Sequence, residues 1–113
     1  MKKFRTILAT SALPYANGNL HIGHILEFVQ TDIWVRYHRQ VGNKCIYISG
    51  IDAHGTPIML SAKNNNVTPF ILANVYKLAH ISDLNSFSIS VDNYYTTHSK
   101  ENFNLSRGIF NKL

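Results

Sequence analysis

The fold is decided between Ala12 and His24, by the run Ala-Leu-Pro-Tyr-Ala-Asn-Gly-Asn-Leu-His-Ile-Gly-His. Before this run, residues 6–11 are short, largely apolar and rich in β-branched side chains, which is typical of a buried parallel strand. After it, apolar residues recur in steps of three and four, which predicts a helix over residues 23–40. The run is therefore predicted to be the loop that joins a strand to a helix.

A second strand is predicted directly after that helix. Gly42 stops the helix, and residues 44–49 form a largely apolar run, Lys-Cys-Ile-Tyr-Ile-Ser. A strand, a helix and a strand in this order form a βαβ unit, whose strands are parallel and whose connection is right-handed. The sequence therefore predicts an α/β fold with a Rossmann-like parallel βαβ core. A NAD-binding form is disfavoured, because no Gly-x-Gly-x-x-Gly follows the first strand.

The rest of the chain is predicted to be mostly helical. Thr68 followed by Pro69 is a helix start, with threonine as the N-cap and proline in the first turn. Thr97 or Ser99 is expected to cap a last helix. The predicted helices cover residues 58–63, 68–85 and 99–113, and a brief extended segment is predicted at residues 89–91.

Length and composition limit the class of protein. A chain of 113 residues forms one domain at most. Its formal charge of +5 is compatible with a nucleic-acid partner, although the basic residues form no dense stripe. Cys45 is the single cysteine, so no internal disulfide is possible, which fits a reducing compartment and predicts a cytoplasmic protein. No apolar run approaches ~18 residues, so no membrane-spanning helix is predicted.

Two histidines stand at the start of the first predicted helix. Free backbone N–H groups and the positive end of the helix dipole favour a polyphosphate there. The spacing of three places His21 and His24 on one side of the first turn, and Gly23 lets a bulky group approach the backbone. Two other interpretations stay open: histidines that pack against a neighbouring turn, and a zinc-binding pair, for which cysteine ligands and a histidine cluster are missing.

A second candidate segment begins where the second predicted strand ends. In open parallel sheets, ligands bind beyond the carboxyl ends of the strands. The run after the first strand and Asp52 after the second both lie just past such ends, so we expect them at one edge of the sheet. A carboxylate there suits a substrate ammonium group, but an aspartate at this position also commonly caps a turn.

Three blocks of this sequence resemble the methionyl type of class I aminoacyl-tRNA synthetases. His21-Ile22-Gly23-His24 matches the HIGH signature of the class, and the run from residue 12 to 24 is similar to its methionyl version. Residues 50–58 resemble the family's second strand end and the following loop, and residues 90–94 with 97–99 resemble a third block. The blocks occur in the family's order and spacing over essentially all 113 residues.

The resemblance implies a methionine–tRNA ligase, which forms methionyl-adenylate from methionine and ATP with Mg²⁺ and then charges tRNA(Met). In the family, the two signature histidines contact the ATP phosphates, which makes His21 and His24 the implied catalytic residues. The other implied ATP-binding residues are Asn17, Gly18 and Gly23. The implied methionine-binding residues are Ala12, Leu13, Tyr15 and Asp52.

The sequence also departs from the family. Ile51 stands where a small or polar residue is usual, which predicts a shift of the loop that presents Asp52. Residues 1–113 lack the KMSKS signature, the connective insertion with its zinc-binding cysteines and the anticodon-binding domain. We therefore expect residues 1–113 to be the N-terminal part of the catalytic domain, holding half of an active site. No metal ligands are predicted here, although the family implies a structural zinc.

The sequence leaves three alternatives open. The chain could be a non-catalytic or decayed fragment, because its architecture is incomplete. It could belong to another class I synthetase, for cysteine or a branched aliphatic amino acid. It could also be a HIGH-bearing nucleotidyltransferase without a tRNA substrate.

Overall fold

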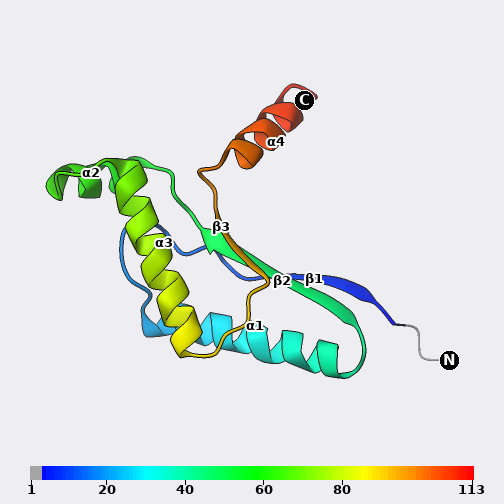
Figure 1. Ribbon diagram of the computed structural model, residues 1–113. Coiled ribbons are helices and arrows are strands. Elements are labelled where there is room, and N and C mark those ends of the chain that lie inside the picture. Colours follow the sequence, from blue (N-terminus) through cyan, green and yellow to red (C-terminus); the bar gives the residue numbers. More distant parts are fainter. Residues whose placement is uncertain (1–3) are drawn as a thin grey trace.

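The computed structural model describes residues 4–113 as a three-stranded parallel sheet with four helices (Figure 1). Along the chain, the elements are β1 (Thr6–Thr10), α1 (Ile22–Gln40), β2 (Lys44–Ile51), α2 (Thr56–Asn64), α3 (Pro69–Ser86), β3 (Asn93–Thr96) and α4 (Lys100–Phe110). The strands lie side by side in the order β1-β2-β3. The predicted α/β fold with a parallel βαβ core is confirmed.

The register of the strands brings their carboxyl ends to one edge of the sheet. Thr10 of β1 lies opposite Ile48 of β2, and Ile51 at the end of β2 lies opposite Thr96 at the end of β3. From this edge the chain continues into three loops, at residues 11–21, 52–55 and 97–99. The two signature blocks predicted to carry chemistry therefore begin at the same edge.

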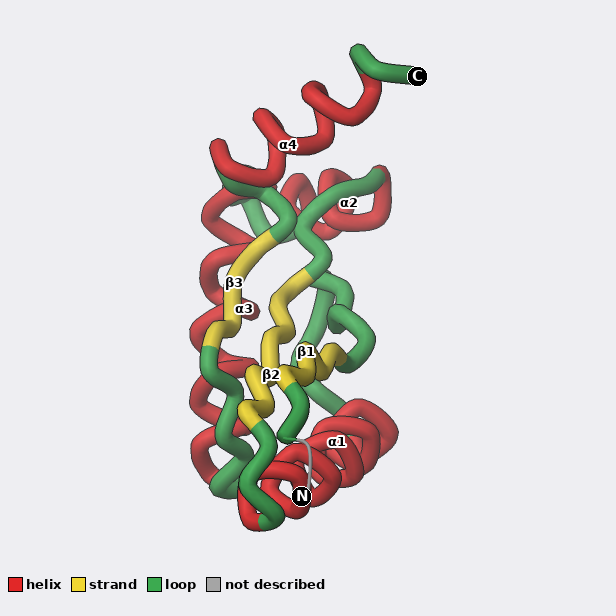
Figure 2. Tube along the Cα trace, turned by 90° about the vertical axis from the view of Figure 1, so that its right-hand side faces the viewer, coloured by secondary structure: helices red, strands yellow, loops and turns green. Residues whose placement is uncertain are grey.

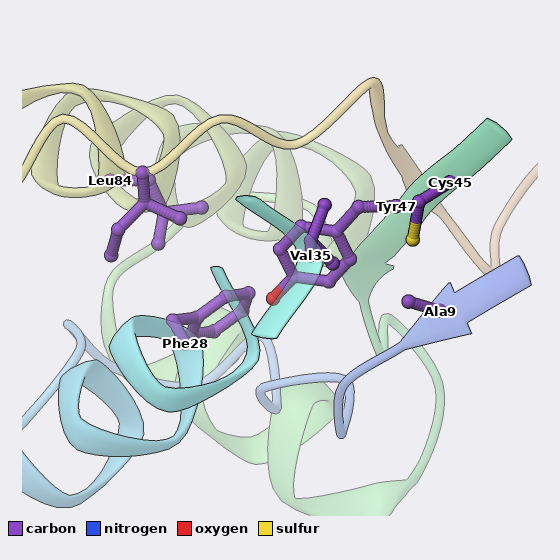
Figure 3. Packing of buried hydrophobic residues seen from close by; sticks show 7 residues of the cluster. Ala9, Phe28, Val35, Cys45, Tyr47 and Leu84 are labelled. Carbon is purple, nitrogen blue, oxygen red and sulfur yellow. The ribbon is translucent and has the colours of Figure 1, made fainter. Parts of the chain in front are cut away.

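The first core cluster lies between the sheet, α1 and the end of α3 (Figure 3). Phe28 and Val35 of α1 pack with Tyr47 of β2 and Leu84 of α3, and all four are nearly or fully buried. The hydroxyl of Tyr47 donates to Ser11 Oγ at 3.0 Å, so its polar end is satisfied inside the core. Burial raises the pKa of this phenol, which keeps its proton in place.

A second core cluster lies close to the carboxyl edge of the sheet. Ile51 at the end of β2 packs there with Ala16, with Ile58 of α2 and with Leu72 of α3. Ile51 is fully buried, and the strand pairing continues past it to Asp52. The isoleucine side chain therefore fills this cluster, and the strand pairing before the Asp52 loop is kept.

One sequence-based expectation is wrong. The extended segment predicted at residues 89–91 is not a strand, because the third strand lies at Asn93–Thr96. Ile89 is buried in the first cluster, so its apolar character reflects burial rather than strand pairing. Among the described residues, α1 is only partly covered, since Leu26 is 57% exposed and Trp34 is 46% exposed.

The last helix, α4, packs little against the rest of the described chain. Ser99 caps it by accepting the N–H of Asn102 at 3.1 Å, so the choice between Thr97 and Ser99 as the cap is resolved. No residue of α4 is buried, and Figure 2 shows the helix projecting at one end, beyond the sheet. Within residues 4–113, none of the helices is both long enough and apolar enough to cross a membrane.

Candidate active site

Two imidazole rings cap the first turn of α1. His21 is the N-cap, and its Nδ1 accepts the N–H of Gly23 at 3.1 Å. His24 reaches back, and its Nδ1 accepts the N–H of His21 at 3.3 Å. The rings stack on the same side of the turn, as their spacing predicts, with centroids 3.7 Å apart and planes inclined by 23°. This reciprocal arrangement is a capping box built from histidines.

The caps fix which ring nitrogen carries the proton. A backbone N–H can only donate, so each Nδ1 must accept, and each neutral ring then carries its hydrogen on Nε2. Burial, followed by the nearby His21 and His80, lowers the pKa of His24, against a smaller opposing effect of Glu27. His24 is therefore a neutral N–H donor at neutral pH. The helix start thus presents two Nε2–H donors to a ligand.

Gly23 has a structural role at the helix start. A Cβ on this residue would lie 3.0 Å from Cε1 of His21, so the imidazole packs directly on the glycine. Gly23 therefore permits the histidine cap to form. The predicted approach of a ligand to the backbone of Gly23 stays a prediction.

The first two signature blocks meet beyond the ends of β1 and β2. Tyr15 and Asp52 form an isolated parallel bridge, in which Ala16 N–H donates to the Asp52 carbonyl at 2.8 Å and Asp52 N–H donates to the Pro14 carbonyl at 2.8 Å. The hydroxyl of Tyr15 lies over Gly55, where a Cβ would clash with it. The loops after β1 and β2 are thus held together by backbone pairing.

The carboxylate of Asp52 is held at one oxygen. Thr97 Oγ1 donates to Asp52 Oδ1 at 3.4 Å and accepts the N–H of Ala53 at 2.9 Å. The N–H of His54 lies 3.5 Å from the same carboxylate oxygen. Neither of the two ion pairs within residues 4–113 involves Asp52. The half-buried carboxylate is therefore open to a cationic group of a ligand.

The remaining predicted residues lie along the loop between β1 and α1. The N–H of Ala12 donates to Glu27 Oε1 at 2.7 Å, which ties the strand exit to α1. Leu13 is 44% exposed, and Asn17 is exposed. The carbonyl of Gly18 accepts from His80 Nε2 at 2.8 Å.

Sequence analysis missed two residues that organise this region, Glu27 and His80. A signal for His80 was present, because Tyr76, His80 and Leu84 recur every four residues on α3 and so share one face of that helix. No sequence pattern, however, says what a buried histidine contacts. Glu27 carried no comparable signal, since an exposed glutamate on a helix is ordinary.

A cavity of about 600 Å³ lies beside the loop after Asp52, between α2, α3 and β3. Its lining includes His54, Phe70, Lys77, Tyr95 and His98, and His54 Nε2 lies 3.0 Å from His98 Nδ1. None of the predicted site residues lines it. The cavity and the predicted site are therefore neighbouring but separate features.

Comparison with known proteins identifies the family. The family described as tRNA synthetases class I (M) matches residues 7–113, which is nearly the whole chain. The chain belongs to this family. It is 50% identical over 113 residues to the methionine–tRNA ligase of Wigglesworthia glossinidia brevipalpis, covering 100% of this chain and 20% of that protein. It is 54% identical over 110 residues to the methionine–tRNA ligase of Buchnera aphidicola subsp. Acyrthosiphon pisum, covering 97% of this chain and 20% of that protein.

A solved methionyl-tRNA synthetase structure shares the fold of this chain. Mycobacterium tuberculosis methionyl-tRNA synthetase in complex with methionyl-adenylate superposes with a TM-score of 0.82 at 24% identity. The match covers 88% of this chain and 19% of that one. The chain thus has the Rossmann-like architecture of this synthetase and spans about one fifth of the curated relatives it matches.

The described residues do not fit the structural zinc that the resemblance implies. Among residues 4–113, no three His, Cys, Asp or Glu side chains lie close enough together to hold a metal ion. Cys45 is buried in the first core cluster.

Proposed function

We propose that this chain contributes the ATP- and methionine-binding half of a methionine–tRNA ligase. The observation that carries the proposal is the bridge between Tyr15 and Asp52, which joins the first two signature blocks beyond the ends of β1 and β2. Ligands of parallel α/β sheets bind at this edge. In the proposed reaction, the carboxylate of methionine attacks the α-phosphate of ATP and pyrophosphate leaves.

The phosphates of ATP are proposed to bind at the start of α1. His21 and His24 each direct Nδ1 to the helix backbone, which leaves Nε2–H as the donor to phosphate oxygen. The positive end of the helix dipole adds to this attraction. Asn17 and Gly18 lie in the loop before the two histidines, where they would contact the nucleotide, and Gly23 supports the His21 ring. Aimed donors of this kind stabilise the charge that develops on the phosphates.

Methionine is proposed to bind at the bridge itself. Asp52, held at Oδ1 by Thr97, would take the α-ammonium group through its charge. Ala12, Leu13 and Tyr15 would contact the thioether side chain, which offers no strong hydrogen-bonding group and must be selected by shape. No enzyme nucleophile is required, because catalysis comes from alignment and from stabilisation of charge.

We infer that the methionyl group then passes to tRNA(Met), that Mg²⁺ accompanies ATP as part of the substrate, and that the protein acts in the cytoplasm. Residues 1–113 contain no Lys-Met-Ser-Lys-Ser segment, whose lysines stabilise the activation transition state in the family. We therefore expect residues 1–113 alone to show no measurable methionine activation.

A chimeric enzyme tests the proposal. The 113 residues would replace the matching segment of the Wigglesworthia ligase, which is 50% identical to them. We expect methionine-dependent exchange of pyrophosphate into ATP at a rate within about tenfold of the parent enzyme. Exchange that depends on cysteine or a branched aliphatic amino acid would overturn the assignment of methionine. A folded chimera without any exchange would indicate a non-catalytic remnant.

The histidines need variants that separate ligand binding from helix capping. His21→Ser and His24→Gln preserve a capping box of the Ser-x-x-Gln type while they remove both imidazoles. If the rings bind phosphate, the double variant should keep its thermal midpoint and lose exchange activity by at least ~10²-fold. Full activity in this variant would show that the histidines only cap the helix.

A further inference from the structure

His80 is a fully buried polar side chain at the centre of α3. Its Nε2 lies 2.8 Å from the carbonyl oxygen of Gly18, and its Nδ1 lies 3.1 Å from the hydroxyl of Tyr94. Both ring nitrogens are thus engaged, as the burial of a polar group requires. The contacts connect three segments that are distant in sequence: the loop before α1, α3 and β3.

The chemistry of the partners determines the tautomer of His80. A carbonyl oxygen can only accept, so Nε2 must carry the hydrogen that is donated to Gly18. In the neutral ring, Nδ1 is then an acceptor, and the hydroxyl of Tyr94 donates to it. Burial raises the pKa of Tyr94, which keeps this donor protonated. The imidazole is therefore a fixed link from β3 to the loop.

The loop that His80 holds leads directly to the helix cap. Its first end is fixed by the hydrogen bond between Ala16 N–H and the Asp52 carbonyl, and its last residue, His21, is the N-cap of α1. Between these points, a Cβ on Gly18 would meet no heavy atom within 4 Å, so packing around its α-carbon does not restrain it. The hydrogen bond from His80 fixes the middle of the loop.

We propose that His80 is a positioning residue for nucleotide binding, which acts by holding the Gly18 carbonyl and thereby the loop that delivers His21 to the start of α1. This inference rests on the proposed function of the two capping histidines. His80 does not contact the nucleotide. A displacement of a reacting group by about 1 Å can cost ~10²-fold in rate, so a single anchor of this kind has kinetic consequences.

Three variants separate positioning from simple stabilisation. His80→Leu removes both hydrogen bonds, whereas His80→Gln retains a side-chain N–H that can reach Gly18. Tyr94→Phe removes the bond to the same imidazole but leaves the Gly18 contact in place. A purely structural role predicts that activity loss follows the thermal midpoint across all three variants.

The activity assay is pyrophosphate exchange in the chimeric enzyme, whose unaltered form must first be active for the proposed function to stand. We expect His80→Leu to raise the KM for ATP by about tenfold, the scale of one hydrogen bond, with the KM for methionine changed less than about twofold. His80→Gln should restore most of the ATP affinity. Tyr94→Phe should lower the thermal midpoint but raise the KM for ATP less than about threefold.

The inference would be overturned if His80→Leu raised the KM values for ATP and methionine equally. It would also be overturned if the KM for ATP followed the thermal midpoint in all three variants. If His80→Leu fails to fold, the His80→Gln and Tyr94→Phe variants still decide it. An independent readout uses the 113-residue chain without any activity assay. Long-range ¹H–¹⁵N spectra report which ring nitrogen of His80 is protonated. A hydrogen on Nε2 supports the inference, and a hydrogen on Nδ1 overturns it.

Discussion

The hydroxyl of Thr97 donates to Asp52 across 3.4 Å, so the chain just beyond β3 holds the carboxylate that follows β2. The same oxygen accepts the N–H of Ala53 at 2.9 Å. Thr97 lies 45 residues after Asp52 in the sequence. The orientation of the proposed ammonium-binding group therefore depends on the pairing of β2 with β3.

Replacing Thr97 by valine should affect both stability and methionine binding. Valine has a similar shape but leaves the N–H of Ala53 without an acceptor, so we expect a loss of about 1–3 kcal/mol in the free energy of unfolding. The substitution also frees the carboxylate of Asp52, so we expect the KM for methionine to rise more than the KM for ATP. Urea unfolding of the chain and pyrophosphate exchange in the chimera measure the two effects. Thr97→Ser retains the hydroxyl and serves as the control, and an unchanged methionine KM in Thr97→Val would contradict the prediction.

The lowered pKa of His24 predicts a pH-dependent stability. Its pKa in the folded chain lies below the ordinary value of 6.5, so between these two values the unfolded state binds more protons. The contribution of His24 is therefore complete above pH 6.5 and is lost as the pH falls through that window. The urea midpoint should decrease on acidification, and less steeply in His24→Gln, which still caps the helix but does not titrate. Identical pH slopes for the two proteins would exclude His24 as the source.

A Cβ at Gly55 should disturb Tyr15. Gly55 has a φ of +119°, which side chains rarely adopt, and an added methyl group would clash with the Tyr15 hydroxyl. We expect Gly55→Ala to cost about 1–3 kcal/mol of unfolding free energy and to weaken methionine binding. Tyr15→Phe removes the hydroxyl and therefore the clash, but the backbone strain at Gly55 remains. In that background, Gly55→Ala should lower the free energy of unfolding by less. Strict additivity of the two changes would show that the hydroxyl and Gly55 do not interact.

The elements that the sequence predicts well are those with local signals. The βαβ unit follows from a change of apolar periodicity around the run at residues 12–24, and Thr68 and Ser99 act as the helix caps that their residue type suggests. The third strand was misplaced because Asn93–Thr96 carries no apolar run. Its position is set by the partner, since it pairs with Ile48 to Ile51 of β2, and a single sequence does not specify such a register.

For the candidate site, the sequence predicts its location at the edge of the sheet but not the hydrogen bonds that organise it. The expectation that the loops after β1 and β2 meet at one edge agrees with the bridge between Tyr15 and Asp52. The roles assigned to the individual residues stay predictions. The link from His80 to Gly18 spans 62 residues and involves a backbone carbonyl, so no side-chain pattern could indicate it.

The buried carboxylate of Asp32 is expected to stabilise the fold, whatever the function of the chain. Asp32 is 6% exposed, accepts the N–H of Ser90 at 3.0 Å and pairs with Arg36 Nε at 2.5 Å. The side chain of Arg36 is 50% exposed, so water compensates for much of the lost ion pair when Asp32 is replaced.

The bond to Ser90 is therefore the larger contribution. Asp32→Ala removes both interactions and should lower the free energy of unfolding by about 2–4 kcal/mol. Asp32→Asn keeps an amide oxygen that can accept from Ser90, and it should lower the free energy of unfolding by about 1 kcal/mol. Urea unfolding of the chain measures both values. Similar losses in the two variants would mean that the ion pair, rather than the bond to Ser90, anchors the segment between α3 and β3.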